Sequence, residues 1–245
     1  MSWIERMDRV LYPSQGPRWD DAHFRAVVGA ALAEARARAQ GHGVRVLDLG
    51  AGAGIHDALV PRGDGAHVVG VDPDPRVLDN PHLDEGQVGS GDALPFEPAF
   101  FDLVVANNVV EHLDAPEAVF AEVFRVLRPG GRFLFKTPNR FHYVPLLAQL
   151  TPMEFHRWVN RRRGRADEDT FKTRYAANRP AVIRALAARA GFDRVRIELL
   201  EGRPEYLRFS PPTYLLGWAW ERMVNGVPGL ATFRVLIVAE LRRPT

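Results

Sequence analysis

The sequence predicts an α/β protein with a doubly wound, largely parallel sheet and helices on both faces. Short apolar runs rich in Val and Leu recur along the 245-residue chain, and each is too short for a helix. Such runs are typical of strands that are buried on both faces. Segments with helical periodicity alternate with them, which favours a parallel sheet. A glycine-rich turn follows the first run, at the sheet edge where such proteins bind ligands.

The first expected element is an amphipathic helix over residues 19–40, because its apolar side chains recur at helical spacing. Asp20 and Asp21 open this helix, and Gly41 closes it. The apolar runs then predict strands over residues 44–49, 67–72, 102–106, 132–136, 194–200 and 233–241.

Further helices are expected between these strands. One is capped by Asp114 and has Pro116 in its first turn, and another spans residues 180–190 with Gly191 just past its end. A third helix is expected to begin near Ile55, after the glycine turn.

Composition favours one globular domain over residues 1–245. Hydrophobic residues make up 46% of the chain, there are no cysteines for disulfides or thiolate metal sites, and the net charge is only +2. No apolar run approaches the roughly 18 residues of a membrane span, and the N-terminus lacks the apolar core of a signal peptide. A cytoplasmic location without a nucleic-acid partner is therefore expected.

The turn VLDLGAGAG after the first strand carries the first functional signal. Gly50, Gly52 and Gly54 tolerate positive φ and let a ligand approach the backbone, although a purely structural turn is the plain alternative. A dinucleotide fingerprint would need a third glycine where this chain has Ile55. Asp72 ends the next strand, where a carboxylate can accept hydrogen bonds from both ribose hydroxyls. A nucleotide-type ligand is therefore expected.

Four segments follow one another in residues 44–139: VLDLGAGAG, VVGVDPDP, GDALPFEPAFFDLVVANNVVEHLDAP and VLRPGGRFLFKTPN. In this order they resemble the class I S-adenosylmethionine-dependent methyltransferases, particularly the type 11 group that includes ubiquinone and menaquinone biosynthetic enzymes. The resemblance implies a Rossmann-like sheet of seven strands whose last strand, residues 233–241, is antiparallel. It also implies S-adenosylmethionine as cofactor, S-adenosylhomocysteine as product and methyl transfer by in-line displacement.

The resemblance also assigns cofactor contacts. Asp48 and the glycine turn would face the methionine portion, and Asp72 would hold the ribose. Asp92 and the backbone of Ala93 would contact the adenine, beside a crossover that is expected to be truncated. The full expected set is Asp48, Gly50, Ala51, Gly52, Gly54, Asp72, Pro73, Asp92, Ala93, Asn107 and Asn108, of which the two asparagines would lie near the methionine end.

His112 is the candidate catalytic residue, because it follows the fourth strand closely and could serve a hydroxyl acceptor as general base. A packing or capping histidine is the alternative. A quinone-biosynthesis branch of the family resembles E-x-x-E-H here and holds a divalent metal. This chain has Asn108, Glu111 and His112, and the lost carboxylate weakens such a site, so no metal is expected.

Two segments fall outside the alternation of strands and helices, at residues 139–178 and 201–231. We expect them to cap the acceptor side of a cofactor-binding core over residues 44–138, which follows a helical segment over residues 1–43.

The first of these segments contains His142, Tyr143, His156 and Tyr175 as residues that could approach an acceptor. Its arginine-rich part, residues 157–174, suits an anionic acceptor or a solvated helix face. In the second segment, residues 206–223 concentrate aromatic side chains, which could close the acceptor pocket, contact a membrane surface or belong to the core.

The predicted function is methyl transfer to a small-molecule or lipid-like acceptor, with O-, N- and C-methylation all open. A catalytically inactive protein that binds the same cofactor is one alternative. A NAD-dependent oxidoreductase is another, disfavoured by Ile55 and by the antiparallel strand. Nucleic-acid methylation is not expected, since amino-methylating enzymes of that kind resemble N/D-P-P-Y/F where this chain has NNVV. No feature indicates an oligomeric state.

Overall fold

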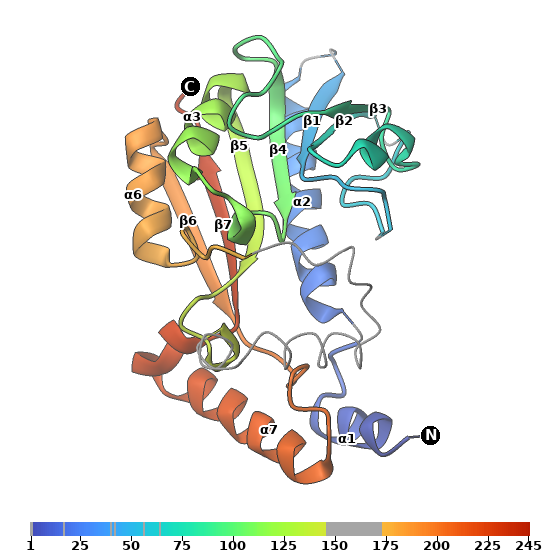
Figure 1. Ribbon diagram of the computed structural model, residues 1–245, viewed down its shortest axis with the longest axis vertical. Helices are drawn as coiled ribbons and strands as arrows, with labels where there is room; N and C mark the ends of the chain where they lie inside the picture. The colour runs from blue at the N-terminus through green and yellow to red at the C-terminus, as the bar shows by residue number, and fades with distance from the viewer. Residues whose placement is uncertain are drawn as a thin grey trace.

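The computed structural model describes residues 2–16, 18–39, 41, 43–55, 57–63, 65–145 and 173–245. Its centre is a seven-stranded sheet in the order β3-β2-β1-β4-β5-β7-β6 (Figure 1). The strands are β1 (Val44–Leu49), β2 (Ala66–Asp72), β3 (Glu85–Val88), β4 (Phe101–Asn107), β5 (Leu127–Pro138), β6 (Arg194–Leu200) and β7 (Leu236–Arg242). Strands β1 to β5 pair in parallel, whereas β7 is antiparallel to both β5 and β6. The predicted α/β sheet and its antiparallel final strand are confirmed.

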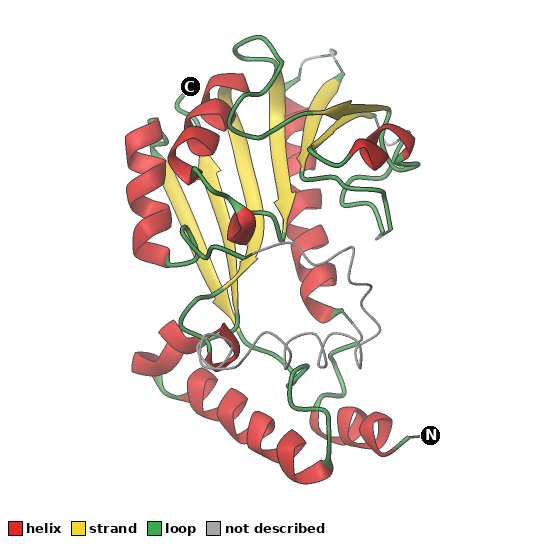
Figure 2. Cartoon of the chain, viewed as in Figure 1, coloured by secondary structure: helices red, strands yellow, loops and turns green. Residues whose placement is uncertain are grey.

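Helices cover both faces of the sheet (Figure 2). α2 (Trp19–Arg38) packs on one face, and α3 (Pro116–Val126) and α6 (Pro180–Ala190) pack on the other. α1 (Trp3–Leu11) and α7 (Pro211–Gly226) lie beyond the carboxyl ends of the parallel strands, at the bottom of Figure 1. Short 3-10 helices are η1 (Pro75–Asp79), η2 (Val110–His112) and η4 (Pro228–Phe233). Among the described helices, none combines the length and apolarity needed to cross a membrane.

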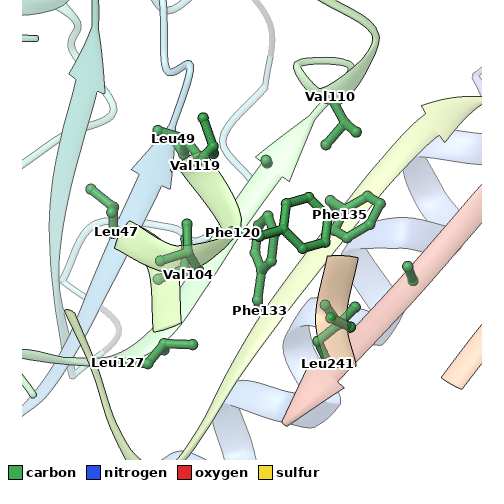
Figure 3. Packing of buried hydrophobic residues seen from close by; sticks show 14 of the residues in the cluster. Leu47, Leu49, Val104, Val110, Val119, Phe120, Leu127, Phe133, Phe135 and Leu241 are labelled. Atoms are coloured by element: carbon green, nitrogen blue, oxygen red, sulfur yellow. The ribbon is translucent and has the colours of Figure 1, made fainter. Parts of the chain in front are cut away.

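The larger apolar cluster lies between the sheet and helices α3 and α6 (Figure 3). Phe120 on α3 packs edge-to-face against Phe133 and Phe135 on β5, with ring centroids 5.6 and 5.9 Å apart. Leu47 on β1 and Leu241 on β7 extend the cluster across the sheet. Full burial of one such side chain contributes about 1.5–3 kcal/mol, so this face holds the strands together.

α2 covers the centre of the opposite face. Its side chains Phe24, Val28 and Leu32 recur every four residues and form one buried stripe against β-strand residues such as Val46 and Leu134. Because this helix contacts β1, β4 and β5, it covers the strands that end at the ligand edge.

The helix expected near Ile55 is absent, because the described residues between β1 and β2 form turns and loops. The side-chain amide of Asn80 donates to the carbonyl oxygens of Ala51 and Gly52 at 3.0 and 3.1 Å. A helix would need those carbonyls for its own first turn. Gly54 is also left-handed, with φ +72°, which a helix does not admit. The prediction of a helix here was wrong.

Asp114 was wrongly predicted to cap the helix that follows it. The N-cap of α3 is Ala115, which provides no side-chain hydrogen bond, and Asp114 instead pairs with Arg174 at 2.5 Å. The truncated crossover between Asp72 and Asp92 is confirmed, since it consists of η1 and the four-residue strand β3. The apolar pattern did not identify β3 because its side chains are exposed or half-buried at the sheet edge.

Two later elements were predicted closely. α6 has Pro180 in its first turn, and Gly191 caps its end with φ +102°. β7 begins at Leu236 and not at residue 233, because the six residues before Arg234 form the 3-10 helix η4.

Candidate functional site

Polar side chains lie at the carboxyl ends of three adjacent strands. Asp72 ends β2, Asp48 is the second-last residue of β1, and Asn107 ends β4. Since β1 lies between β2 and β4, these residues share one edge of the sheet, beside the glycine turn. This is the edge at which open α/β sheets bind their ligands.

The glycine turn is held against β2 by main-chain bonds and by a carboxylate. The N–H of Gly50 donates to the carbonyl oxygen of Val71 at 2.7 Å. One carboxylate oxygen of Asp72 accepts from the N–H of Gly52 at 2.9 Å, and the other accepts from the N–H of Asp74 at 2.8 Å. A carboxylate offers about four lone-pair sites, so Asp72 keeps capacity for ligand hydroxyls while it fixes the turn.

The three glycines of the turn lack a side chain for different reasons. Gly50, Gly52 and Gly54 all have positive φ, at +74°, +55° and +72°. A Cβ on Gly50 would lie 2.3 Å from Val109, and one on Gly54 would lie 2.4 Å from Asn80, so protein packing excludes both. A Cβ on Gly52 would meet no atom within 4 Å. Gly52 therefore presents bare backbone to open space.

The electrostatics of this edge favour a positive charge. Asp48 is half-buried, and burial raises its pKa to about 7, with a further contribution from the neighbouring carboxylate of Asp72. A nearby cation favours the ionised form of a carboxyl group. Two carboxylates in this position therefore suit a ligand that carries a positive charge.

The residues predicted to lie on the adenine side are exposed. Asp92 and Ala93 lie in the loop after β3, where the N–H of Ala93 donates to the carbonyl oxygen of Ser90 at 3.2 Å. Pro73 follows Asp72 directly and is exposed. Within the described ranges, no hydrogen bond joins Asp92 to the glycine turn.

Asn107 and Asn108 lie where α2 meets the sheet. Asn108 has a left-handed backbone, with φ +56°, and its N–H donates to the carbonyl oxygen of Lys136 at 2.9 Å. The fully buried ammonium group of Lys136 pairs with Asp20 at 2.8 Å and with Asp21. Burial opposes ionisation of Asp21, but the bond and charge of Lys136 and a bond with Asn107 lower its pKa. The first turn of α2 is thereby clamped to β4 and β5.

His112 lies in η2, directly after β4, and its side chain is 29% exposed. Its Nε2 atom is 4.0 Å from Oε1 of Glu111. Glu111 is buried, which raises its pKa, and it accepts a hydrogen bond from the hydroxyl of Thr137 at 2.7 Å. Asn178 donates to the same hydroxyl at 2.7 Å. Glu111 is thus engaged in a buried network.

The three residues that align with the metal-binding pattern differ in their surroundings. Asn108 is exposed, whereas Glu111 is buried against Thr137. In the part of the chain that the structure describes, no group of three or more His, Cys, Asp or Glu is placed to hold a metal ion.

α7 packs on the carboxyl side of the sheet through one of its faces. Its Tyr214 is buried and donates to Asp8 on α1 at 2.6 Å, and its Trp220 packs edge-on against Tyr143, with centroids 5.3 Å apart. Burial lowers the pKa of the nearby His142 to about 3, so this ring is neutral. Tyr143 and His142 therefore pack between the sheet and α7.

Other predicted acceptor residues fall largely outside the described chain. His156 and residues 157–172 lie outside it. Tyr175 is described, and its N–H donates to the carbonyl oxygen of Glu111 at 3.1 Å, while burial raises the pKa of its hydroxyl.

The sequence analysis missed two side chains that organise this edge, Asn80 and Lys136. Lys136 carried a signal, because a lysine that ends the apolar run RFLFK must find an anionic partner if the strand is buried. Asn80 carried none, since it binds carbonyl groups 28 and 29 positions away.

These observations fit a nucleoside cofactor with a positive charge. Gly52 leaves room at the backbone, Asp72 ends the neighbouring strand with free acceptor sites, and Asp48 favours a cation. Beside the truncated crossover, Asp92, the residue predicted to contact the adenine, is exposed to solvent.

Similarities to known proteins point to the same kind of cofactor site. Residues 47–135 match the family described as a methyltransferase domain. An uncharacterized methyltransferase of Mycolicibacterium gilvum is 29% identical over 192 residues, which cover 74% of this chain and 69% of that protein.

Solved structures share the fold. A SAM-dependent methyltransferase from Archaeoglobus fulgidus has a TM-score of 0.55 and 16% identity, with coverage of 99% of this chain and 100% of that one. Phosphoethanolamine N-methyltransferase 2 of Haemonchus contortus, in complex with S-adenosyl-L-methionine, has a TM-score of 0.53 and 18% identity, with coverage of 100% and 60%. The fold, the polar residues at the ligand edge of the sheet and the match to the methyltransferase-domain family together identify the chain as a class I S-adenosylmethionine-dependent methyltransferase.

Proposed function

We propose that Asp48, Gly52 and Asp72 hold S-adenosylmethionine and that the methyl group passes to a lipid-like acceptor on the side of the sheet covered by α7. The observation that carries the cofactor assignment is the open space at Gly52, flanked by two carboxylates. S-adenosylmethionine supplies an electrophilic sulfonium methyl group. The protein therefore has mainly to orient the acceptor, and good orientation is worth about 7–11 kcal/mol.

Each predicted cofactor residue has a role in this proposal. Asp48 would favour the positive charge, Asp72 would accept hydrogen bonds from the ribose hydroxyls, and Asp92 would contact the adenine. The backbone or side chains of the remaining residues would complete the site: Gly50, Ala51, Gly54, Pro73, Ala93, Asn107 and Asn108. Residues 44–138 would form the cofactor core of a single domain.

His112 is the residue we propose as general base for a hydroxyl acceptor. It is partly exposed at the ligand edge, whereas the neighbouring Glu111 is buried and bound to Thr137. A positioned base contributes about 10²–10⁴ in rate. His112→Gln should therefore lower kcat by about a hundredfold or more. Titration calorimetry should show unchanged affinity for S-adenosylhomocysteine. Unchanged kcat would show that His112 is not the general base.

The proposal of a lipid-like acceptor rests on the outer face of α7. Leu216 and Met223 are 67% and 43% exposed, and their spacing of seven residues places them on one side of the helix. Val227, which directly follows the helix, is 48% exposed. The neighbouring helix α1 exposes Val10 and Arg9. Apolar side chains beside cations are typical of a helix that lies on an anionic membrane surface.

Methyl transfer and membrane contact can be tested separately. The first assay incubates the protein with methyl-labelled S-adenosylmethionine and either bacterial lipid extract or its water-soluble counterpart. Label in the organic phase would support the lipid-like acceptor, and label only in the aqueous phase would contradict it. Binding of the cofactor without transfer to either extract would favour the inactive alternative.

The second assay is flotation with phosphatidylcholine vesicles that contain phosphatidylglycerol. Leu216→Gln plus Met223→Gln should abolish flotation, because the pair removes the apolar contact. Leu78→Gln plus Val88→Gln is the matched control, since these apolar side chains are also exposed but lie on η1 and β3. Equal flotation of both variants, or no flotation of the wild type, would end the membrane proposal and leave methyl transfer intact.

A further inference from the structure

A groove of about 380 Å³ lies between α2 and strands β5, β7 and β6. Its helical wall consists of Val27, Ala30, Ala31 and Glu34, which share one face of α2. Its strand wall contains Arg132, Arg194, Arg196, Glu240 and Arg242. Small-molecule sites typically measure about 300–1,000 Å³, so the groove is large enough for a compact ligand.

The groove is separate from the cofactor edge. Arg132 lies six residues before Pro138, the last residue of β5. A strand rises about 3.3 Å per residue, which puts Arg132 roughly 20 Å from the carboxyl end. A ligand in the groove would therefore not occupy the space at Gly52.

Three arginines form a row across adjacent strands. In the register of the sheet, Arg242 on β7 is opposite Arg132 on β5 and also opposite Arg194 on β6. Like charges directly opposite one another destabilise a sheet. Arg38 on α2 lies near this row, since burial and then the charges of Arg132 and Arg242 lower its pKa. Cations therefore crowd this part of the sheet.

The carboxylates of the groove do not neutralise this charge. Glu34 and Glu240 both pair with Arg132, the second at 2.9 Å. Among the described residues, Arg194 and Arg242 have no carboxylate within ion-pair distance and no side-chain hydrogen bond, and the same holds for Arg196. In addition, Nε of Arg132 is buried without a hydrogen-bond acceptor. The groove thus holds uncompensated guanidinium groups.

We propose that the groove binds a small anion with at least two linked phosphate groups. Guanidinium groups bind phosphate oxygens through paired, charge-assisted hydrogen bonds. The row from Arg132 to Arg194 spans two strand spacings, about 10 Å, which exceeds the reach of a single phosphate. A linear diphosphate or triphosphate can contact the whole row and relieve the repulsion along it.

The probe for this site is inorganic pyrophosphate, measured by titration calorimetry at low salt on protein saturated with S-adenosylhomocysteine. We expect one site per chain and weaker binding as salt increases. Arg194→Gln plus Arg196→Gln should raise Kd about tenfold or more, which corresponds to at least about 1.4 kcal/mol. Both side chains are exposed, so the fold should survive, and circular dichroism checks this.

The matched control is Arg184→Gln plus Arg189→Gln, which makes the same charge change on α6, across the sheet. Its Kd should stay within about twofold of the wild type, a difference of about 0.4 kcal/mol. Glu34→Gln should tighten binding, because it removes a competing anion from the groove.

Several results would overturn the proposal. Equal weakening in both arginine pairs would reduce the binding to general attraction by a basic surface. Pyrophosphate binding that occurs only when S-adenosylhomocysteine is omitted would place the anion at the cofactor edge and not in the groove. Tighter binding of a polyglutamate peptide than of pyrophosphate would make the groove a docking surface for an acidic protein segment.

Discussion

Gly50 and Gly52 lie two residues apart in one turn, yet a methyl group should affect them differently. Gly50→Ala places Cβ 2.3 Å from Val109, so it should lower stability by about 2–4 kcal/mol through steric overlap and strain at positive φ. Gly52→Ala meets no protein atom within 4 Å, so it should cost about 1 kcal/mol from backbone strain alone.

Urea unfolding and calorimetry with S-adenosylhomocysteine distinguish these two effects. Gly52→Ala should remain folded and lose cofactor affinity, because its methyl group enters the space left for the ligand. Retained affinity in this variant would show that the cofactor does not approach Gly52.

The ionised carboxylate of Asp48 is expected to lower the stability of the protein, although it is proposed to favour cofactor binding. Its pKa is raised to about 7 in the native state, first by burial and then by Asp72, against 3.8 in the unfolded chain. The native state therefore binds more protons between these values, so its stability falls as pH rises from about 4 through 7, at about 1.4 kcal/mol per pH unit. The total is at most about 4 kcal/mol.

Asp48→Asn removes this loss. The variant should be more stable than the wild type at pH 8, and its advantage should be smaller at pH 5. Because Asp48 is proposed to favour the sulfonium charge, the variant should also bind S-adenosylmethionine more weakly, relative to S-adenosylhomocysteine, than the wild type does. Urea unfolding and calorimetry at both pH values test this, and an advantage that does not change with pH would contradict the assignment.

The attachment of helix α2 to the sheet depends on one buried charge. Lys136 is fully buried and pairs with Asp20 and Asp21 in the first turn of this helix. Lys136→Met leaves two carboxylates without their cation, which should cost about 3–5 kcal/mol. For a chain of this size, Tm should fall by roughly 6–20 °C.

A triple variant provides the control for this clamp. Lys136→Met combined with Asp20→Asn and Asp21→Asn removes every charge of the cluster, so much of the lost Tm should return. Differential scanning calorimetry measures both proteins. Equal Tm values for the single and triple variants would mean that the cost comes from packing and not from unpaired charge.

In the molecule as a whole, hydrogen bonds join the segments that were predicted to form a cap to the strands of the sheet. The amide of Asn139 donates to the carbonyl oxygens of Thr232 and Arg234, both at 2.8 Å, and the N–H of Val235 donates to Glu201 at 2.8 Å. The first two bonds link the end of β5, and the third links the end of β6, to the region between α7 and β7. We therefore expect one cooperative unfolding transition.

S-adenosylhomocysteine should stabilise this whole unit. At one hundred times its Kd, a ligand adds about 2.7 kcal/mol, which raises Tm by roughly 5–10 °C here. Circular dichroism reports the secondary structure, and fluorescence reports the tryptophans of α1, α2 and α7 together with Trp158, so both transitions should shift together. Asp72→Ala should reduce the shift. A shift seen by only one probe would show that cap and sheet unfold separately.

Short-range patterns were enough to predict much of this fold. An apolar run, or a helix framed by Pro180 and Gly191, is contained in about ten residues and depends on local backbone preferences. The glycine turn and Asp72 were predicted for the same reason, since positive φ and a strand end are local properties. The order of the four segments in residues 44–139 then indicated S-adenosylmethionine as the cofactor.

Contacts between residues that are far apart in the sequence determine the features that local patterns did not predict. Asn80 takes the carbonyl groups that a helix after Gly54 would need, and Lys136 pairs with Asp20 across 116 positions. The arginine row arises only because β7 inserts between β5 and β6. Each of these interactions depends on which strands are neighbours and on how deeply a charge is buried, and neither property is contained in a local pattern.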